Sequence, residues 1–175
     1  MLRVGSRAPL RNLLKNSSPL LPVVLLLFAT TARAQQDPSA RYAAPQPGKP
    51  LCTLQIHVTG FRNEKGKAGG TVFATPDGWP ENNNKALVHG GFPIAGNQAT
   101  EEFQIPPGKY AVAVIHDENS NHKLDRNFLG IPKEGFGFAN NPKVLLSAPP
   151  FQTAAIQVSC PLTQIEIHLI YKLGR

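Results

Sequence analysis

The strongest constraint on the fold is a period-two pattern that begins near Leu51. Over residues 51–59 mostly polar positions alternate with four apolar ones, Cys52, Leu54, Ile56 and Val58. Successive side chains of an extended strand point to opposite faces, so this spacing turns one face toward a core and the other toward solvent. A helix would need apolar residues three and four positions apart. The folded part of the chain is therefore predicted to open with a half-buried β-strand.

Similar segments follow, separated by turns rich in Gly, Pro and Asn. The pattern predicts a β segment around residues 70–75 and a short helix or strand near residues 85–89. It also predicts strands over Ala99–Ile105, Tyr110–Ile115, Thr153–Ser159 and Gln164–Tyr171. Residues 110–115 are almost continuously apolar, as a central sandwich strand is. Without an amphipathic helix pattern after residue 51, the pattern predicts an all-β fold. We expect one antiparallel β-sandwich of the immunoglobulin or transthyretin type, with about seven strands over residues 51–172.

Residues 1–34 have the pattern of a secretory signal peptide. A basic start without acidic residues leads into the apolar run Leu20–Ala29 and then into Ala32-Arg33-Ala34. That run is about half the length that a membrane-spanning helix needs. We expect cleavage after Ala34, a flexible lead-in over residues 35–50, and a periplasmic or secreted mature chain without a transmembrane span. The alternatives are a mitochondrial presequence and an uncleaved membrane anchor.

The high positive charge of the chain arises largely in this leader. The formal net charge is +7, but without residues 1–34 only thirteen basic residues oppose eleven acidic ones, which leaves +2. The remaining Lys and Arg residues are scattered among predicted loops and form no basic stripe. This distribution argues against nucleic-acid binding.

Two cysteines are present, Cys52 at the start of the first predicted strand and Cys160 just before the last one. In an oxidising compartment a bridge between them would close a loop of about a hundred residues and stabilise the fold by roughly 4 to 5 kcal/mol on the chain-entropy model. We expect this disulfide; the alternative is two buried free thiols. A thiol enzyme is not indicated, because the chain contains no C-x-x-C motif.

Oxygen-bearing side chains recur at every second position directly after the predicted central strand. Asp117, Asn119, Asn121 and Asp125 match positions one, three, five and nine of a calcium-binding loop, with the carbonyl near Lys123 at position seven. Calcium requires six to eight oxygen ligands, and alternate residues of such a loop supply them. The spacing predicts calcium as a cofactor bound by these four side chains.

Two positions depart from a calcium-loop pattern. Position six is His122, where glycine is usual because the loop bends sharply there, and position twelve is Phe128 instead of a carboxylate. Glu134 can replace that carboxylate only if the chain folds back. The alternative is a metal-free loop whose Asp and Asn side chains accept hydrogen bonds from nearby backbone amides and so brace the long connection over residues 117–141.

No catalytic residue is predicted. His116 and Asp117 are adjacent on an extended chain, so they point to opposite faces and are poorly placed to form a dyad. The histidines lack the spacing of a metal pair, and the serines lack a nucleophile-elbow context. Trp79, which lies beside Gly78 and Pro80, is either a sugar-stacking residue or a loop aromatic folded back on the sandwich.

Three runs of sequence resemble one bacterial family. They are PGKYAV from Pro107, IHDENSNHKLDRNFLGIPKEGFGFANN from Ile115 and PFQTAA from Pro150. Together they resemble the family catalogued as domain of unknown function 2141, with a similarity that extends from Leu51 to Tyr171. The resemblance implies a secreted or periplasmic β-sandwich without an assigned activity. The family pattern reads H-D-E-N-x-N-G-K-L-D, often with a further Gly before the second Asn; Ser120 and His122 stand at the two glycine positions.

The function predicted from the sequence is that of an exported, non-enzymatic β-sandwich module that binds a protein or a glycan. The loop over residues 117–141 and the Trp79 region are the surfaces expected to carry the partner. Two other classes remain open: a metal-free structural accessory domain of the envelope, and a hydrolase or metal enzyme.

Overall fold

The alternating residues at the start of the fold form a strand, as predicted. In the computed structural model, which describes residue 48 and residues 50–172, strand β1 (Cys52–Thr59) buries Cys52, Leu54, Ile56 and Val58 completely. The residues between them face the surface, so period-two alternation confers one apolar face on the strand. The predicted signal peptide, its cleavage point and the lead-in up to residue 47 lie outside the described residues.

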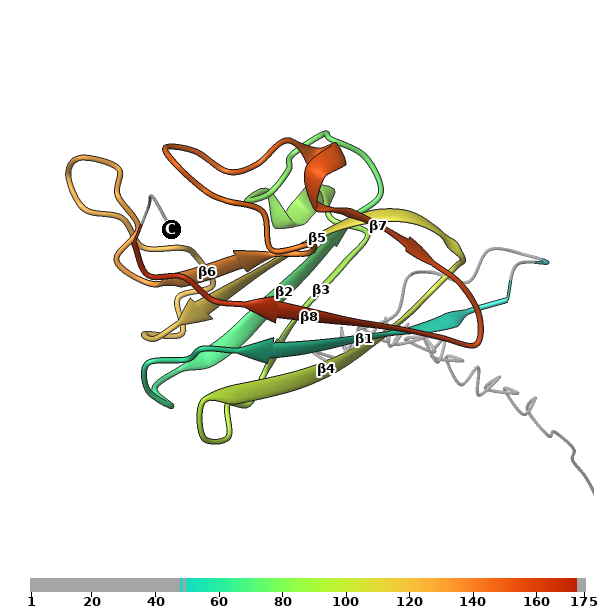
Figure 1. Ribbon diagram of the computed structural model, residues 1–175, viewed down its shortest axis with the longest axis horizontal. Helices are drawn as coiled ribbons and strands as arrows, with labels where there is room; N and C mark the ends of the chain where they lie inside the picture. The colour runs from blue at the N-terminus through green and yellow to red at the C-terminus, as the bar shows by residue number, and fades with distance from the viewer. Residues whose placement is uncertain (1–47, 49, 173–175) are drawn as a thin grey trace, which may run out of the picture. The chain divides into compact units, whose positions relative to one another are not determined.

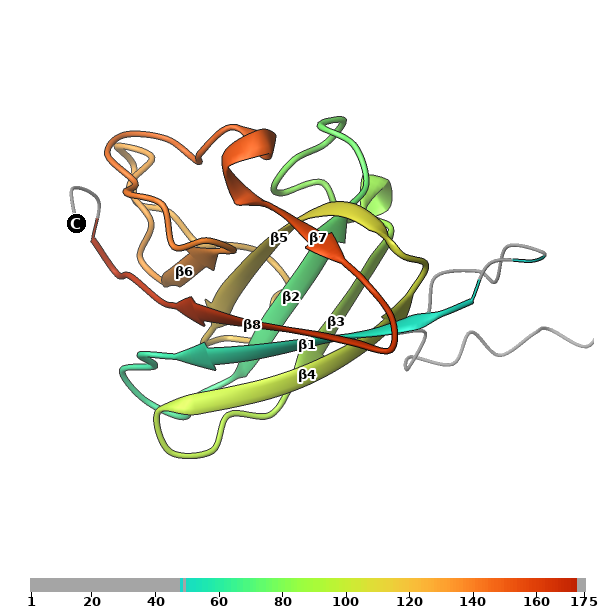
Figure 2. The same ribbon diagram turned by 45° about the vertical axis from the view of Figure 1, so that its right-hand side comes forward.

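Within the described residues eight strands form two sheets, which confirms the all-β sandwich (Figure 1). One sheet has the order β4-β1-β8, and the other has the order β3-β2-β5-β6, with β7 paired to the first part of β5. The remaining bounds are β2 (Lys67–Phe73), β3 (Val88–Phe92), β4 (Gln98–Ile105), β5 (Gly108–Asp117), β6 (Gly135–Phe138), β7 (Ala155–Val158) and β8 (Leu162–His168). In Figures 1 and 2 the strands of the three-stranded sheet lie side by side and cross obliquely over those of the larger sheet.

The pairing of the first and last strands differs from the prediction of a wholly antiparallel sandwich. Strand β1 pairs with β4 antiparallel but with β8 parallel, in a register that places Thr53 opposite Leu162 and Thr59 opposite His168. A parallel pair cannot be joined by a hairpin and needs a long crossover connection. Here the whole domain between β1 and β8 serves as that connection, so this pair brings the two ends of the fold together.

The main core lies between the two sheets. It contains the four buried residues of β1, aromatic and branched side chains from β3, β4, β5 and β8, and Leu169 just after β8. The predicted alternation of Ile165, Ile167, Leu169 and Tyr171 is confirmed, because all four side chains belong to this core or pack against it. Strand β8 ends at His168, however, and the residues after it continue along the core as an irregular segment.

A second core covers part of the outer face of the larger sheet. Phe73, Ala111, Phe138 and Phe151 are buried there, and the side chain of Trp79 packs against them. This covering is made by loops and by the short 3-10 helix η2 (Phe151–Ala154), while η1 (Asn83–Lys85) lies in the loop before β3. Strand β5 is thus buried on both faces, which explains its nearly continuous apolar sequence.

Three segments differ from the sequence prediction. β6 lies inside residues 117–141, which were expected to hold little regular structure. Residues 153 and 154 belong to η2 instead of a strand, so β7 is only four residues long. The uncertain segment near residues 85–89 contains the end of η1 and the start of β3.

Candidate functional site

The four residues predicted to bind calcium lie together at the end of β5. Asp117, the last residue of β5, is 3% exposed, and its two carboxylate oxygens accept hydrogen bonds from the backbone N–H groups of Asn121 and His122, at 2.9 and 2.8 Å. The side-chain amides of Asn119 and Asn121 donate to the two oxygens of Asp125, at 2.8 and 3.0 Å. The structure therefore brings the four residues into one hydrogen-bonded network, which Asp117 joins through the backbone of Asn121.

A second buried carboxylate closes the base of this loop. Glu134 is 4% exposed, and its two oxygens accept the backbone N–H groups of Glu118 and Asp125, each at 2.9 Å. The chain does fold back as the calcium pattern requires, although Glu134 follows Asp117 by seventeen residues instead of eleven. Each buried oxygen has a charge-assisted hydrogen bond, which is about twice as strong as a neutral one.

The two positions that departed from the family pattern adopt a backbone conformation that favours glycine. Ser120 has φ +59° and His122 has φ +63°, both in the left-handed region. A residue with a Cβ atom pays roughly 1 to 2 kcal/mol for this conformation, whereas glycine does not. The bend of the loop is thus preserved at the cost of local strain.

The oxygen atoms of the loop are already used by hydrogen bonds within the chain. Asn119 and Asn121 each accept a backbone N–H with the side-chain oxygen, from Asn121 and Lys123 respectively. Across the described residues, no group of three or more His, Cys, Asp or Glu side chains is arranged to hold a metal ion. A calcium ion would need amide and carbonyl oxygens in addition to the carboxylates.

A buried histidine lies one residue before the loop, on the opposite face of β5. His116 is fully buried; its Nδ1 lies 2.6 Å from Tyr171 Oη and its Nε2 lies 2.9 Å from the carbonyl oxygen of Lys65. A carbonyl oxygen only accepts, so Nε2 carries a proton, and in the neutral ring Nδ1 accepts the Tyr171 hydroxyl. Burial raises the pKa of the Tyr171 phenol above its ordinary value, which keeps this donor protonated.

This histidine holds the C-terminal segment and is not paired with Asp117. Tyr171 Oη also accepts the backbone N–H of Arg62 at 3.0 Å, and the guanidinium carbon of Arg62 lies 4.7 Å from the centroid of the Tyr171 ring. Arg62 forms an ion pair with Glu118 at 2.5 Å. His116 and Asp117 thus have different hydrogen-bond partners on opposite faces of β5.

Trp79 is turned toward the second core. Its indole N–H donates to the carbonyl oxygen of Pro149 at 2.8 Å, and its ring lies 5.5 to 6.0 Å from the rings of Phe73, Phe138 and Phe151. Of the two interpretations of Trp79, the structure supports a loop aromatic folded back on the sandwich.

The predicted disulfide is present. Cys52 and Cys160 are bonded, with a sequence separation of 108. The bond joins the start of β1 to the turn that leads into β8, beside the parallel pair. It therefore closes nearly the entire folded part of the chain into one loop.

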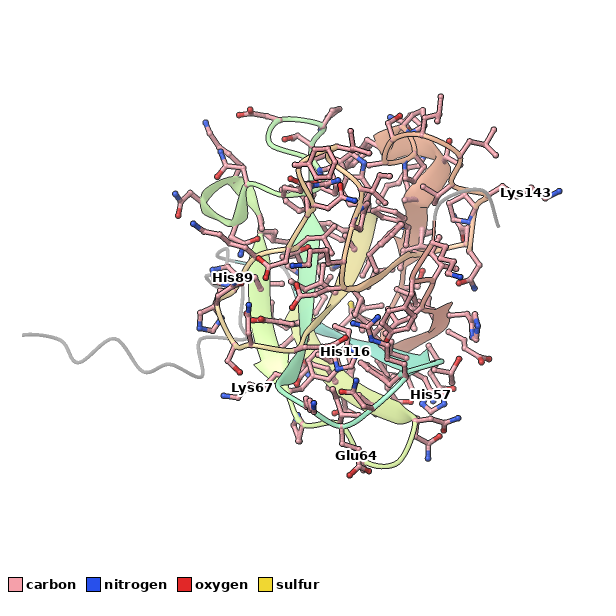
Figure 3. The ribbon with its side chains drawn as sticks, turned by 90° about the vertical axis from the view of Figure 1, so that its left-hand side faces the viewer. His57, Glu64, Lys67, His89, His116 and Lys143 are labelled. Atoms are coloured by element: carbon pink, nitrogen blue, oxygen red, sulfur yellow. A yellow bond between two sulfur atoms is a disulfide. The ribbon has the colours of Figure 1, made fainter. Side chains whose placement is uncertain are left out.

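A groove of about 790 Å³ lies over the larger sheet, and its lining includes Phe136, Phe138 and other residues of the second core. One cross-strand row of its floor consists of Gly91, Gly69, Ile115 and Phe136, which are register partners on β3, β2, β5 and β6. Figure 3 shows β3 and β2 together with Lys67 and His89, which border the groove on this side of the molecule. The paired glycines leave a trough in the sheet surface because they lack side chains.

The walls of the groove are loops. One wall belongs to the predicted calcium loop and contributes His122, Lys123, Leu124 and Arg126. The loop between β6 and η2 forms another wall, where Leu146 is 90% exposed. The brace around Asp117 and Glu134 therefore fixes the shape of a groove wall.

The sequence alone did not indicate this groove. Its signal was two Gly-Gly pairs, at residues 69–70 and 90–91, which lie in β2 and β3. Glycine within a strand marks close approach of another group or a bulge. The second pair lies in β3, a strand that the sequence left undecided, so the two pairs could not be placed side by side.

Fold and groove define a class: a disulfide-closed, all-β domain with an open groove on one sheet. The chain belongs to the family DUF2141, described as "Uncharacterized protein conserved in bacteria", whose model matches residues 56–166. No curated protein and no solved structure matches the chain. None of the helices in the described part of the chain has the length and apolar character to cross a membrane.

Proposed function

We propose that this protein is an exported, non-enzymatic binding module that takes its partner in the groove over β2, β3 and β5. The observation that carries the proposal is the groove itself, whose volume of about 790 Å³ is in the range of ligand sites. The sequence suggested a protein or a glycan as partner, with Trp79 as one anchor. Because Trp79 faces the second core, the groove replaces the Trp79 region as the proposed binding surface.

Export rests on the leader pattern and is supported by the disulfide. Disulfides persist in oxidising compartments such as the periplasm and the extracellular space. The bond between Cys52 and Cys160 is therefore what a periplasmic or secreted domain would contain.

The arrangement of polar groups in the groove favours binding over catalysis. Asp117 is occupied by two backbone N–H groups, and Glu81 forms an ion pair with Arg126. The hydroxyl of Thr71 donates to the carbonyl oxygen of Ala113. A hydrolase would need a nucleophile hydrogen-bonded to a base. The brace instead has the features of a structural element that holds a wall in place.

Calcium binding by the loop is a second candidate role. It is favoured by the convergence of Asp117, Asn119, Asn121 and Asp125 and by the return of Glu134 to the loop. This role is tested by comparing the melting temperature in EDTA with that in millimolar calcium. An ion that binds only the folded state raises the melting temperature. An equal melting temperature in both solutions would leave the loop as a metal-free brace.

Binding in the groove is tested with Nile red, a neutral dye that fluoresces in apolar sites. We expect dye binding to the purified protein and its loss in Gly91→Leu. A Cβ atom at Gly91 meets only ordinary contacts, 3.6 Å or more away, so the new side chain enters the trough without displacing the backbone. Gln157→Leu, an exposed change on β7 outside the groove, is the matched control. Equal dye binding by the two variants would refute the groove and favour a purely structural accessory domain.

A further inference from the structure

One row of the groove floor offers no side-chain hydrogen bonds to a partner; the neighbouring row contains Thr71, whose hydroxyl is bonded to Ala113, and the exposed His89. Strand β2 is paired along its length with β3 on one side and β5 on the other, so its N–H and C=O groups are engaged in the sheet. The side chains beside Gly69 and Gly91 in the same row are Ile115 and Phe136, both apolar. Sugar hydroxyls or peptide groups placed on the row of Gly69 and Gly91 would lose their hydrogen bonds to water without replacement.

The walls continue this apolar surface. Leu124, Val144, Leu146 and Ala148 contribute to the lining, and Leu146 leaves 90% of its surface exposed at the edge of the groove. A chain bound in the apolar trough would cover this exposed leucine. Burial of its apolar surface would stabilise the complex by about 25 cal/mol for each Å² removed from water. The body of the occupant is therefore apolar and narrow enough to lie along a trough two strands wide.

The rim, by contrast, is cationic. Lys67 extends from the start of β2 with its Cδ atom 3.6 Å from the position of a Cβ at Gly91, and Lys123 lies on the facing loop. Both side chains are exposed, and within the described part of the chain neither ammonium group has an ion pair or a hydrogen bond. The two carboxylates of the lining, Asp117 and Glu81, are engaged with backbone N–H groups and with Arg126. Hydrogen bonding leaves the charge of Asp117 in place, so the five charged side chains of the lining, three cationic and two anionic, sum to +1.

We infer that the groove binds a single-chain anionic amphiphile, such as a long-chain carboxylate, as a free monomer. The inference rests on the proposed function, because it names the chemical class of partner for the same groove. The alkyl chain lies over Gly69 and Gly91, where no side chain obstructs it, and the anionic head reaches Lys67 and Lys123. A glycan, a peptide or the surface of an anionic membrane are the competing occupants.

Isothermal titration calorimetry with dodecanoate, below its micelle concentration, tests the inference. We expect saturable one-to-one binding that weakens with added salt, because the rim charges are exposed and therefore screened. Lys67→Gln with Lys123→Gln should weaken dodecanoate binding about tenfold, the effect of two exposed ion pairs. Octyl glucoside, which has a neutral head, should bind equally to the double variant and the unchanged protein.

The controls separate failure of the inference from failure of the groove. Lys133→Gln with Lys143→Gln removes the same charge outside the lining and should leave dodecanoate affinity unchanged. If the protein binds Nile red but not dodecanoate, the anionic head of the proposed ligand is overturned while the groove stands. If it binds neither ligand, the groove itself is overturned. Saturable binding of maltohexaose or of an acidic peptide in place of dodecanoate, or sedimentation with phosphatidylglycerol vesicles without monomer binding, would also overturn the inference.

Discussion

Replacement of Tyr171 by Phe removes one oxygen atom and leaves the ring in place. The ring fills the space in front of Gly135, where a Cβ would lie 2.6 Å from it, and it stacks against Arg62. These contacts remain in the variant. What is lost is the hydroxyl that donates to Nδ1 of His116 and accepts the backbone N–H of Arg62.

The loss is unequal at the two partners. The N–H of Arg62 lies near the surface, so water can replace its acceptor at little cost. His116 is fully buried, and its Nδ1 is left without a donor. A buried polar atom without a partner costs about 1 to 3 kcal/mol. We therefore expect Tyr171→Phe to lower the free energy of unfolding by about 2 kcal/mol.

Urea unfolding followed by fluorescence measures this change, since Trp79 is the single tryptophan and packs in the second core. A double-mutant cycle with His116→Phe isolates the pair, and we expect the two changes to be non-additive by about 1 kcal/mol. Nitrogen NMR of the His116 ring should show the Nε2–H tautomer. A free energy of unfolding for Tyr171→Phe within about 0.5 kcal/mol of the unchanged protein, or additivity in the cycle, would refute the hydrogen-bond chain.

Three further perturbations test other parts of the fold. Ser120→Gly should stabilise the protein by about 0.5 to 1 kcal/mol in urea unfolding, because the strain removed from the left-handed backbone conformation exceeds the entropy that glycine adds to the unfolded chain. A lower unfolding midpoint would contradict the left-handed conformation of Ser120. Cys52→Ser with Cys160→Ser should lower the free energy of unfolding by about 4 to 5 kcal/mol, as should reduction of the unchanged protein, and an unaltered midpoint would count against the bridge. Burial raises the pKa of Tyr110 and of Tyr171, so the neutral phenols are favoured in the folded state. Their contribution to the free energy of unfolding is complete below about pH 10 and is lost as the pH rises through the folded-state pKa. Melting temperatures measured from pH 8 to 12 should fall on the alkaline side, and the fall should be smaller when both tyrosines are Phe; an equal fall would show that other groups cause it.

The sequence was most informative where side chains alternate between core and solvent. Residues 52–58 and 110–115 predicted strands because their apolar spacing is set by burial on one or both faces of a sheet. The segment of β6, GFGF, gave no such signal: Gly135 and Gly137 face the core as empty positions, where a Cβ would lie 2.6 Å from Tyr171 and Ile167. Close approach between strands depends on tertiary packing, so it cannot be predicted from the spacing of apolar residues along the chain.

The candidate site was predictable in its local part. Asp117, Asn119, Asn121 and Asp125 are near neighbours in the chain, so their convergence follows from the loop pattern. The groove depends on which strands are adjacent, and the parallel pairing of β1 with β8 shows that adjacency did not follow from chain order. Calcium binding and the proposed partner remain predictions.

The position of the disulfide beside the parallel strands has a mechanical consequence. Tension applied between the two termini enters at Cys52, crosses the bond to Cys160 and leaves along β8. The chain between the two cysteines, and with it the groove, lies outside this load path. Because the disulfide carries the force past β1, the hydrogen bonds that β1 shares with β8 do not bear it. A domain closed in this way can be tethered at either end without transmitting the pull to its binding surface.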